Sequence, residues 1–220
     1  MIYEEIKDFY LKYGGKKCII GYSLGGRALF AMHAGSLSGR QFISVYAVHA
    51  REWITARLAL EHISRGAAEG WGGWIIPLLN PDGALISQTK APLWKANLRG
   101  VDLNCNFDAH WGTGALNTRT RGIMPHVTFA FHTKGEEIYW EFFGGGDEGG
   151  ANILHAATGY AVKKITGSAG GYKDWCIERL RIPAYTIECG SDRLSHPITD
   201  IKQLKKCYNA LYIFTERYGR

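Results

Sequence analysis

The sequence predicts a single α/β domain over residues 1–220, with a mixed, mostly parallel, twisted sheet that helices cover on both faces. Strand-like apolar segments alternate along the chain with segments of helical periodicity, which is the pattern of such a sheet. The composition is even, and no linker-like stretch divides it. With 220 residues and 46% hydrophobic content, the chain is long enough to bury one sizeable core.

The expected helices and strands follow one another from the N-terminus. Residues 41–50 are mostly apolar and are therefore expected to form a buried strand. Residues 52–68 repeat apolar side chains at helical spacing and end before a glycine-rich stretch. The other expected elements are a helix at 2–13, two strands within 16–35, a strand at 74–83, a long loop at 80–122, strands at 126–132 and 136–143, helices at 151–158 and 171–180, a strand at 183–190 and a closing helix at 199–217.

The cysteines and the net charge limit the kinds of metal site and the classes of partner that we expect. Five cysteines without close pairs favour a reducing compartment over a disulfide framework or a cysteine-rich zinc module, so any metal must be held by histidine and carboxylate. The net charge is +6, but the lysines and arginines are dispersed, and we do not expect a nucleic-acid partner. An acidic small substrate fits the same charge.

The sequence also bears on location. No window reaches the roughly 18 uncharged apolar residues of a membrane span. The start "MIYEEIKDFYLKYGGKK" is charged and amphipathic rather than signal-like. We therefore expect a cytoplasmic protein without a membrane span, and the sequence leaves the oligomeric state open.

His49 and Glu52 stand three residues apart where an apolar run gives way to a helical pattern. They have the spacing of two metal ligands, but a glutamate also favours the positive end of a helix, and a lone histidine is often a satisfied core residue. In α/β sheets, sites gather where strands end. His132 and Glu188 each lie at the end of a further apolar strand, so they are expected to approach the same edge.

A second motif competes for the active site. "GYSLGG" satisfies Gly-x-Ser-x-Gly around Ser23, the pattern of a nucleophile elbow in α/β-hydrolases. That elbow needs strands and an oxyanion loop upstream of the serine, for which the N-terminal position leaves no room. The alternative interpretation is a tight hairpin at Gly25 and Gly26.

Six blocks occur in a characteristic order: "HAREWIT", "PLLNPDG", "LWKANLRGVDLNCNF", "FHTKGEEIYW", "GGYKDW" and "YTIECG". Together they resemble the zinc carboxypeptidase family, the kin of carboxypeptidase A, over about residues 16–190. "LWKAN" and "HTKGEEIYW" look most like the bacterial branch that cuts the γ-D-glutamyl-diaminopimelate bond of peptidoglycan stem peptides. The resemblance implies a phosphorylase/hydrolase-like fold.

The resemblance also assigns the chemical groups. It implies that His49, Glu52 and His132 hold one Zn²⁺, and two imidazoles with one carboxylate suit a catalytic zinc that keeps a position open. It implies that Glu188 is the general base, which takes a proton from the attacking water and passes it to the leaving amine. Lys95 stands where family members usually carry an arginine, and a cation there stabilises the tetrahedral oxyanion.

Other substrate positions depart further from the family. Cys105 replaces the arginine that, with Asn104, holds the substrate's terminal carboxylate, so the bidentate clamp is missing. Thr166 replaces a mobile tyrosine, and Arg99 is a further cation that is expected to approach the site. The remaining position is Lys173, in the pocket for the residue after the cut. A lysine there favours a carboxylate-bearing group such as diaminopimelate, although a solvated surface lysine is the ordinary alternative.

The chain is also shorter than relatives in the region 113–125, either through a trimmed rim or through a missing segment. The sequence therefore predicts a zinc metallopeptidase that acts on peptides or muropeptides, most specifically at the γ-D-glutamyl-diaminopimelate bond. Two alternatives stay open: a carboxypeptidase that removes C-terminal residues from ordinary peptides, and a zinc-binding or peptidoglycan-binding protein without turnover.

Overall fold

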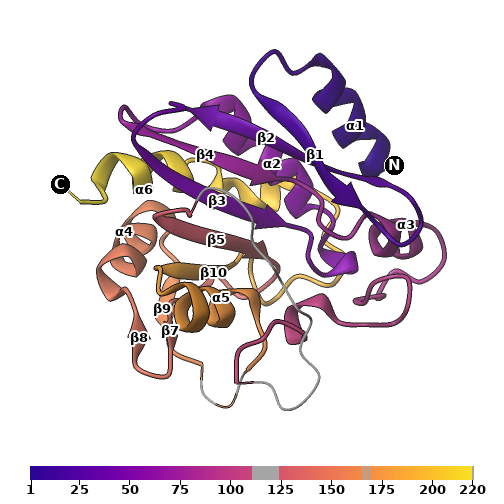
Figure 1. The fold of residues 1–220 in the computed structure, drawn as a ribbon. Coiled ribbons are helices and arrows are strands. Elements are labelled where there is room, and N and C mark those ends of the chain that lie inside the picture. The colour runs from indigo at the N-terminus through magenta and orange to yellow at the C-terminus, as the bar shows by residue number, and fades with distance from the viewer. Residues whose placement is uncertain (111–123, 166, 168, 220) are drawn as a thin grey trace.

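A computed structural model describes residues 1–110, 124–165, 167 and 169–219 (Figure 1). Its main sheet has eight strands in the order β1-β2-β4-β3-β5-β10-β6-β9. The pairs β3·β4, β3·β5, β5·β10 and β6·β9 are parallel, and the other three are antiparallel. The strands of this sheet are β1 (Lys17–Tyr22), β2 (Ala28–Gly35), β3 (Arg40–Tyr46), β4 (Trp71–Ile76), β5 (Val127–His132), β6 (Glu137–Tyr139), β9 (Ala161–Lys163) and β10 (Ala184–Glu188).

Six α-helices accompany the sheet in the described part of the chain. They are α1 (Ile2–Lys12), α2 (Thr55–Arg65), α3 (Pro81–Thr89), α4 (Glu148–Thr158), α5 (Tyr172–Trp175) and α6 (Ala210–Arg217). The shorter elements are 3-10 helices at Ala50–Glu52, Leu103–Cys105 and Ile201–Cys207, a π-helical turn at Cys176–Leu180, and a two-stranded ribbon of β7 (Glu141–Phe142) and β8 (Gly145–Gly146).

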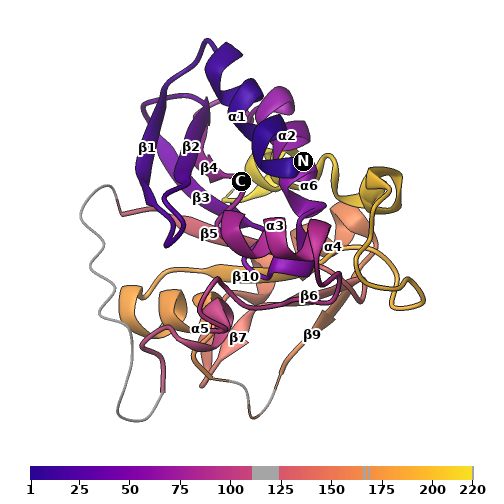
Figure 2. The same cartoon turned by 90° about the vertical axis from the view of Figure 1, so that its right-hand side faces the viewer.

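The two faces of the sheet are covered differently. Figure 2 shows α1, α2, α4 and α6 on one side and α5 on the other. Side chains along β5 alternate between the two faces in agreement with this arrangement. Phe129 and Phe131 join the large core under the first set of helices, whereas Ala130 packs toward Tyr172 of α5. His132 follows the alternation of Ala130 and so projects on the α5 face. The predicted mixed, mostly parallel sheet with helices on both faces is confirmed.

One sequence expectation was wrong in a way that matters for the site. The stretch 80–122 is not one long loop, because α3 and the 3-10 helix Leu103–Cys105 lie within it. The Asn80 side chain accepts a hydrogen bond from Gly83 N, and Pro81 occupies the first helical turn, so the helix begins with a standard cap. "NPDG" also fits a turn, which is why the sequence pattern concealed the helix.

Four further features of the secondary structure differ from what the sequence predicts. The expected strand at 136–143 is split into β6 and β7, and the closing helix begins as a 3-10 helix before α6. The short edge strand β9 was not expected from the sequence. His49 does not end its strand, because β3 stops at Tyr46 and the backbone of Ala47 turns into the left-handed region with φ 49°.

The hairpin interpretation of the Gly-x-Ser-x-Gly stretch agrees with the structure. Ser23 lies in the turn between β1 and β2, so a strand follows it instead of the helix that a nucleophile elbow requires. Its hydroxyl donates to Asp82 Oδ1 at 2.9 Å, and the same buried carboxylate accepts from Gly25 N and from the Arg27 guanidinium. These contacts anchor the hairpin on α3.

Two other sequence expectations concern cysteines and membranes. The five cysteines are free thiols, and three of them are buried: Cys176, Cys189 and Cys207. None of the helices within the described ranges is both long and apolar enough to cross a membrane.

His62 makes the fold sensitive to acid. This buried histidine donates through Nε2 to Cys207 O at 2.7 Å, so its Nδ1 accepts from the Tyr46 hydroxyl and the ring is neutral. Burial lowers the pKa of His62 to about 4, against about 6.5 in the unfolded chain. The unfolded state therefore binds the extra proton first as pH falls.

We expect this histidine to remove up to ~1.4 kcal/mol of stability per pH unit as pH falls from about 6.5 toward 4. Denaturant unfolding of metal-free protein at several pH values, compared with His62→Gln, measures the contribution. The variant should be less stable near neutral pH but should show the shallower pH dependence. Equal slopes in the two proteins would contradict this account of His62.

Candidate metal centre

His49 and Glu52 reach the site through the turn that follows β3. After Ala47 the chain enters the 3-10 helix Ala50–Glu52, whose first amide, Ala50 N, donates to Lys95 O at 3.0 Å. Thr55 fixes the other side of the turn, because its hydroxyl donates to Glu52 O and accepts from Ala47 N. The turn therefore holds His49 and Glu52 in one orientation beyond the end of the strand.

His132, the last residue of β5, completes a cluster of three ligand-type side chains. Its Nδ1 lies 2.8 Å from Glu52 Oε2 and 3.2 Å from His49 Nδ1, and His49 Nδ1 lies 2.9 Å from Glu52 Oε1. The three residues are 7%, 2% and 0% exposed, in the order His49, Glu52 and His132. Their ligand atoms all lie within 4.8 Å of one another.

This cluster fits a tetrahedral zinc ion. Zinc bonds of about 2.0–2.1 Å place two tetrahedral ligand atoms about 3.3 Å apart, close to the 3.2 Å between the two Nδ1 atoms. Both imidazoles present the same ring nitrogen to the carboxylate, so the lone pairs converge once the rings are deprotonated. His132 Nδ1 faces His49 and Glu52 and is therefore the candidate ligand atom of this residue, while its Nε2 is buried without a hydrogen-bond partner in the described structure.

Asp102 lies next to His49 on the side away from the other two ligands, and the sequence analysis did not identify it. Its Oδ1 lies 3.2 Å from His49 Nε2, the ring nitrogen that faces away from the other ligands, while its Oδ2 lies 2.7 Å from Lys95 Nζ. A carboxylate on the far nitrogen of a metal-binding histidine fixes the ring and its tautomer. The available signal was an aspartate two residues before Asn104 in the block "VDLNCNF".

The charges of the cluster are strongly coupled. Burial by itself disfavours a charged His49, but Glu52 and Asp102 outweigh it and raise the pKa of His49 to about 9. Burial likewise disfavours the Glu52 carboxylate, yet the two histidines hold the pKa of Glu52 well below its usual range. Burial lowers the pKa of His132. A carboxylate that stays ionised beside a neutral imidazole suits a cation ligand set.

Glu188 lies next to the cluster on the neighbouring strand. It is the last residue of β10, and its Cα is paired with that of His132 in the parallel β5·β10 register. Burial, reinforced by the negative charge of Glu52, raises the pKa of Glu188 to about 8. Among the described ion pairs it has no cationic partner, so its carboxylate stays available to a substrate or to water.

Beside Glu188 lies a small cavity of about 100 Å³. It receives Thr186 and Glu188 from β10, and Lys173 and Asp174 from α5. Its remaining lining residues are Asn104, Tyr139, Ile165 and Gly171. The cavity joins the C-terminal end of a parallel strand, the usual position of a ligand site in an open α/β sheet.

Only some of the other residues predicted from the sequence to bind substrate lie at this cavity. Asn104 lines the cavity and accepts a hydrogen bond from Tyr172 N, and Lys173 is buried, not solvated. Cys105 is exposed on its 3-10 turn. Arg99 is exposed, and the described ion pairs do not join it to the cluster. Thr166 lies outside the described residues.

The shortened region 113–125 falls almost wholly within residues 111–123, which also lie outside the described residues.

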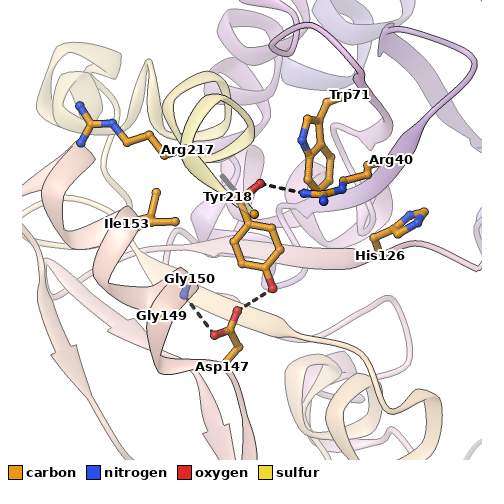
Figure 3. A pocket seen from close by; sticks show the side chains of 10 residues that line it. Arg40, Trp71, His126, Asp147, Gly149, Gly150, Ile153, Arg217 and Tyr218 are labelled. Carbon is orange, nitrogen blue, oxygen red and sulfur yellow. Dashed lines mark hydrogen bonds between the residues drawn. The ribbon is translucent and has the colours of Figure 1, made fainter.

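A larger groove lies at the opposite edge of the sheet. It measures about 580 Å³ and is lined by residues such as Arg40, His126 and Tyr218 (Figure 3). Arg40 begins β3 and His126 precedes β5, so the groove stands at the amino ends of strands whose carboxyl ends lead to the cluster. Asp147 binds the Tyr218 hydroxyl there at 2.6 Å. None of the predicted site residues that the structure describes lines it.

We expect Asp102→Asn to weaken zinc binding by about 10- to 100-fold, because an amide cannot reproduce the charged support of His49. Zinc affinity measured by chelator competition tests this. The matched control is Asp8→Asn, on the exposed surface of α1, which should leave the affinity unchanged. Equal affinities in the two variants would show that Asp102 does not support the metal ligand.

Comparisons with known proteins agree with the site. A family model described as zinc carboxypeptidase matches residues 71–125. Gamma-D-glutamyl-L-diamino acid endopeptidase 1 of Lysinibacillus sphaericus is 27% identical over 76% of this chain, and the chain spans 58% of that relative's length. Metallocarboxypeptidase A of Trichophyton rubrum is 30% identical over 48% of this chain and 32% of its own length.

Solved structures share the fold. Bovine thrombin-activatable fibrinolysis inhibitor, in complex with tick carboxypeptidase inhibitor, superposes with a TM-score of 0.76 at 16% identity, covering 97% of this chain and 93% of that one. A murein-tripeptide amidase from Escherichia coli O157 superposes with a TM-score of 0.62 at 19% identity, covering 96% and 94%.

The fold and the ligand cluster resemble those of one class of protein, the zinc metallopeptidases. Within that class, the resemblance to the zinc carboxypeptidase family that the sequence blocks predicted is confirmed. The predicted zinc cofactor is in keeping with both the family and the ligand cluster.

Proposed function

We propose that this protein hydrolyses a peptide or isopeptide bond at the cluster of His49, Glu52 and His132, with Glu188 as the general base. The convergence of the three ligand-type side chains beside a carboxylate that has no ion-pair partner among the described residues carries the proposal. Zinc, when bound, supplies a Lewis acid that polarises the scissile carbonyl and makes water more acidic. His49, Glu52 and His132 are the residues that would hold it.

The chain's own side chains supply the proton transfers and the charge stabilisation. Glu188 takes a proton from the attacking water and delivers it to the leaving amine, a role that needs a carboxylate without a competing partner. Lys95 donates to the oxygen that becomes negative in the transition state. Its ammonium has three N–H groups, so the ion pair with Asp102 leaves donors for a substrate.

The substrate we propose is the γ-D-glutamyl-diaminopimelate bond of peptidoglycan stem peptides. The names of the Lysinibacillus relative and of the murein-tripeptide amidase support this class. Cys105 supports it as well, because a thiol in place of an arginine removes the clamp by which a carboxypeptidase demands a terminal carboxylate.

Incubation of the zinc-loaded protein with defined muropeptides, followed by mass analysis of the products, tests the proposal. We expect release of fragments that begin with diaminopimelate. Release of single C-terminal residues from ordinary peptides would instead identify a carboxypeptidase. Zinc-dependent binding without any product would identify a binding protein, and either result overturns the proposed substrate.

Cys105 makes a specific prediction about substrate length. Without an arginine clamp, a stem tetrapeptide with D-Ala beyond diaminopimelate should be cut at a rate comparable to that of the tripeptide. Cys105→Arg should shift preference toward the tripeptide by about tenfold or more, the factor given by about 1.4 kcal/mol of selective transition-state binding. The ratio of kcat/KM values for the two peptides measures it. Cys18→Arg, on β1, is the control, and an unchanged ratio in Cys105→Arg would contradict the clamp argument.

A further inference from the structure

The groove at the amino ends of β3 and β5 carries two arginines without an acidic partner. Arg40 and Arg217 both line it, and neither forms an ion pair within the part of the chain that the structure describes. Its volume of about 580 Å³ lies in the range of about 300–1,000 Å³ that small-molecule sites occupy. The proposed hydrolysis at the other edge of the sheet does not use this groove.

The Arg40 guanidinium is held in place by its surroundings. Its central carbon lies 5.5 Å from the centroid of the Trp71 ring, and one of its N–H groups donates to Tyr218 O at 2.9 Å. Trp71 is only 4% exposed, so it is a fixed support for the cation. Gly219 makes room for this packing, because a Cβ at that position would collide with the guanidinium. A guanidinium has five N–H donors, so Arg40 keeps four for a ligand.

His126 adds a donor whose position the backbone determines. Its Nδ1 accepts a hydrogen bond from Gln41 N at 3.1 Å, so the ring proton is on Nε2. The ring packs edge-on against Trp71, with the two ring centroids 6.4 Å apart. Figure 3 shows Arg40 and His126 on the same side of the Tyr218 ring. The two side chains therefore share Trp71 as a support and both present N–H donors to the groove.

Asp147 is the acidic residue in the described lining of the groove, and its charge is already shared among donors. Its Oδ2 accepts from the hydroxyls of Tyr185 and Tyr218 at 2.8 and 2.6 Å, and its Oδ1 accepts from Gly150 N at 3.2 Å. Burial by itself would raise the pKa of Asp147, but these hydrogen bonds outweigh it and lower that pKa. The carboxylate stays ionised without pairing with an arginine, so the lining keeps two positive charges against one negative charge.

These groups define the class of ligand that the groove fits. A positively charged lining with converging N–H donors favours an oxyanion, and an arginine pairs with carboxylate or phosphate oxygens through two parallel hydrogen bonds. Ile153 and the Tyr218 ring line the same groove (Figure 3). Apolar side chains with a few placed polar groups are typical of sites for small organic molecules.

We propose that this groove binds a small organic ligand through an oxyanion, either a carboxylate or a phosphate monoester, with Arg40 and His126 as the binding residues. Arg40 supplies the paired hydrogen bonds, and His126 adds one from Nε2–H. Arg217 contributes a further positive charge at the groove. Because the metal cluster lies beyond the carboxyl ends of β3 and β5, this is a second site that does not depend on the proposed peptidase activity.

Calorimetry on the zinc-loaded protein with three ligands that share a phenyl ring tests the proposal. Benzoate carries a carboxylate, phenyl phosphate carries a phosphate monoester, and benzyl alcohol carries no charge. We expect at least one of the two anions to bind about tenfold or more tightly than benzyl alcohol, the factor that corresponds to ~1.4 kcal/mol. The tighter anion identifies the source of the oxyanion. Two anions that each bind within about threefold of benzyl alcohol overturn the proposal.

Substitutions in the groove should weaken the binding of the anion alone. We expect Arg40→Gln to lower that affinity by about tenfold or more and His126→Ala to lower it as well, because each removes an N–H donor. The matched control is Arg179→Gln, which removes an exposed arginine on the π-helical turn after α5 and should leave the affinity unchanged. An Arg40→Gln protein that binds the anion as tightly as the wild type overturns the proposal.

The position of the bound anion is measured separately, because the open position of a catalytic zinc also accepts ligands. In ¹H–¹⁵N spectra of the labelled wild-type protein, the anion should shift the amide signals of Gly149, Gly150 and Gly219, which line the groove. Shifts confined to amides around His49 and His132 would place the anion on the metal and overturn the proposal. This measurement needs no variant, so it decides the question even where a substitution prevents folding.

Discussion

Glu188→Gln should keep zinc bound but lower turnover by about 10²- to 10⁴-fold, the range contributed by a general acid-base group. Glutamine preserves the shape of the side chain at the end of β10, but its amide cannot accept the proton of the attacking water. Because a base acts only when ionised, wild-type turnover should also fall as pH drops through the pKa of Glu188. That acid limb should be absent from the residual activity of the variant.

The measurement is kcat on a muropeptide substrate with zinc content determined on the same sample. Ser23→Ala is the matched control, because Ser23 is the nucleophile of the competing hydrolase interpretation and its observed partners are Asp82 of α3 and the backbone of Arg27. We expect Ser23→Ala to have a modest effect on turnover. Near-normal turnover in Glu188→Gln would remove this residue from the mechanism.

His132→Ala should abolish stoichiometric zinc binding and, with it, the activity. Only two ligands remain after this change, and the vacated position at the end of β5 has no other histidine or carboxylate in the described cluster. Zinc per chain, measured by elemental analysis after dialysis, should fall from about one to near zero, as three-ligand catalytic sites require all of their ligands.

The control for that variant is His126→Ala, an exposed histidine at the amino end of the same strand. It should retain about one zinc per chain, as expected of a residue outside the three-ligand set. Full zinc content in His132→Ala would falsify the ligand assignment. Loss of zinc in both variants would indicate a general loss of structure instead.

The chemical groups of the site were predictable from the sequence. The types and order of the blocks around His49, His132 and Glu188 predicted a His-Glu-His ligand set with a nearby base, and strand ends on neighbouring parallel strands meet at one edge of a sheet. Local pattern also sufficed for most strands and for α1 and α2, because their apolar residues recur with the period of the element.

Two local features were hidden because short-range signals conflicted. "NPDG" reads as a turn, although Asn80 caps a helix there and Asp82 uses its carboxylate to hold the β1–β2 hairpin. The Gly-x-Ser-x-Gly stretch satisfies a catalytic pattern although its serine is tied to that same carboxylate. The helix cap joins Asn80 to Gly83 only three residues on, whereas the contact that decides the role of the serine joins Ser23 to Asp82, 59 positions away.

The sequence by itself determined the class of sheet, because periodicity is a local property, and its resemblance to the zinc carboxypeptidases implied the ligand set and the proposed base. Only the tertiary structure decided that Asp102 lies 3.2 Å from His49 Nε2 and that Asp174 pairs with Lys173 in the cavity wall. Whether a charge is free or paired depends on distance and burial, and burial is set by packing between segments that the sequence does not place side by side. The charge that Lys173 presents in the cavity therefore follows from the folded arrangement of the pair, not from the presence of a lysine.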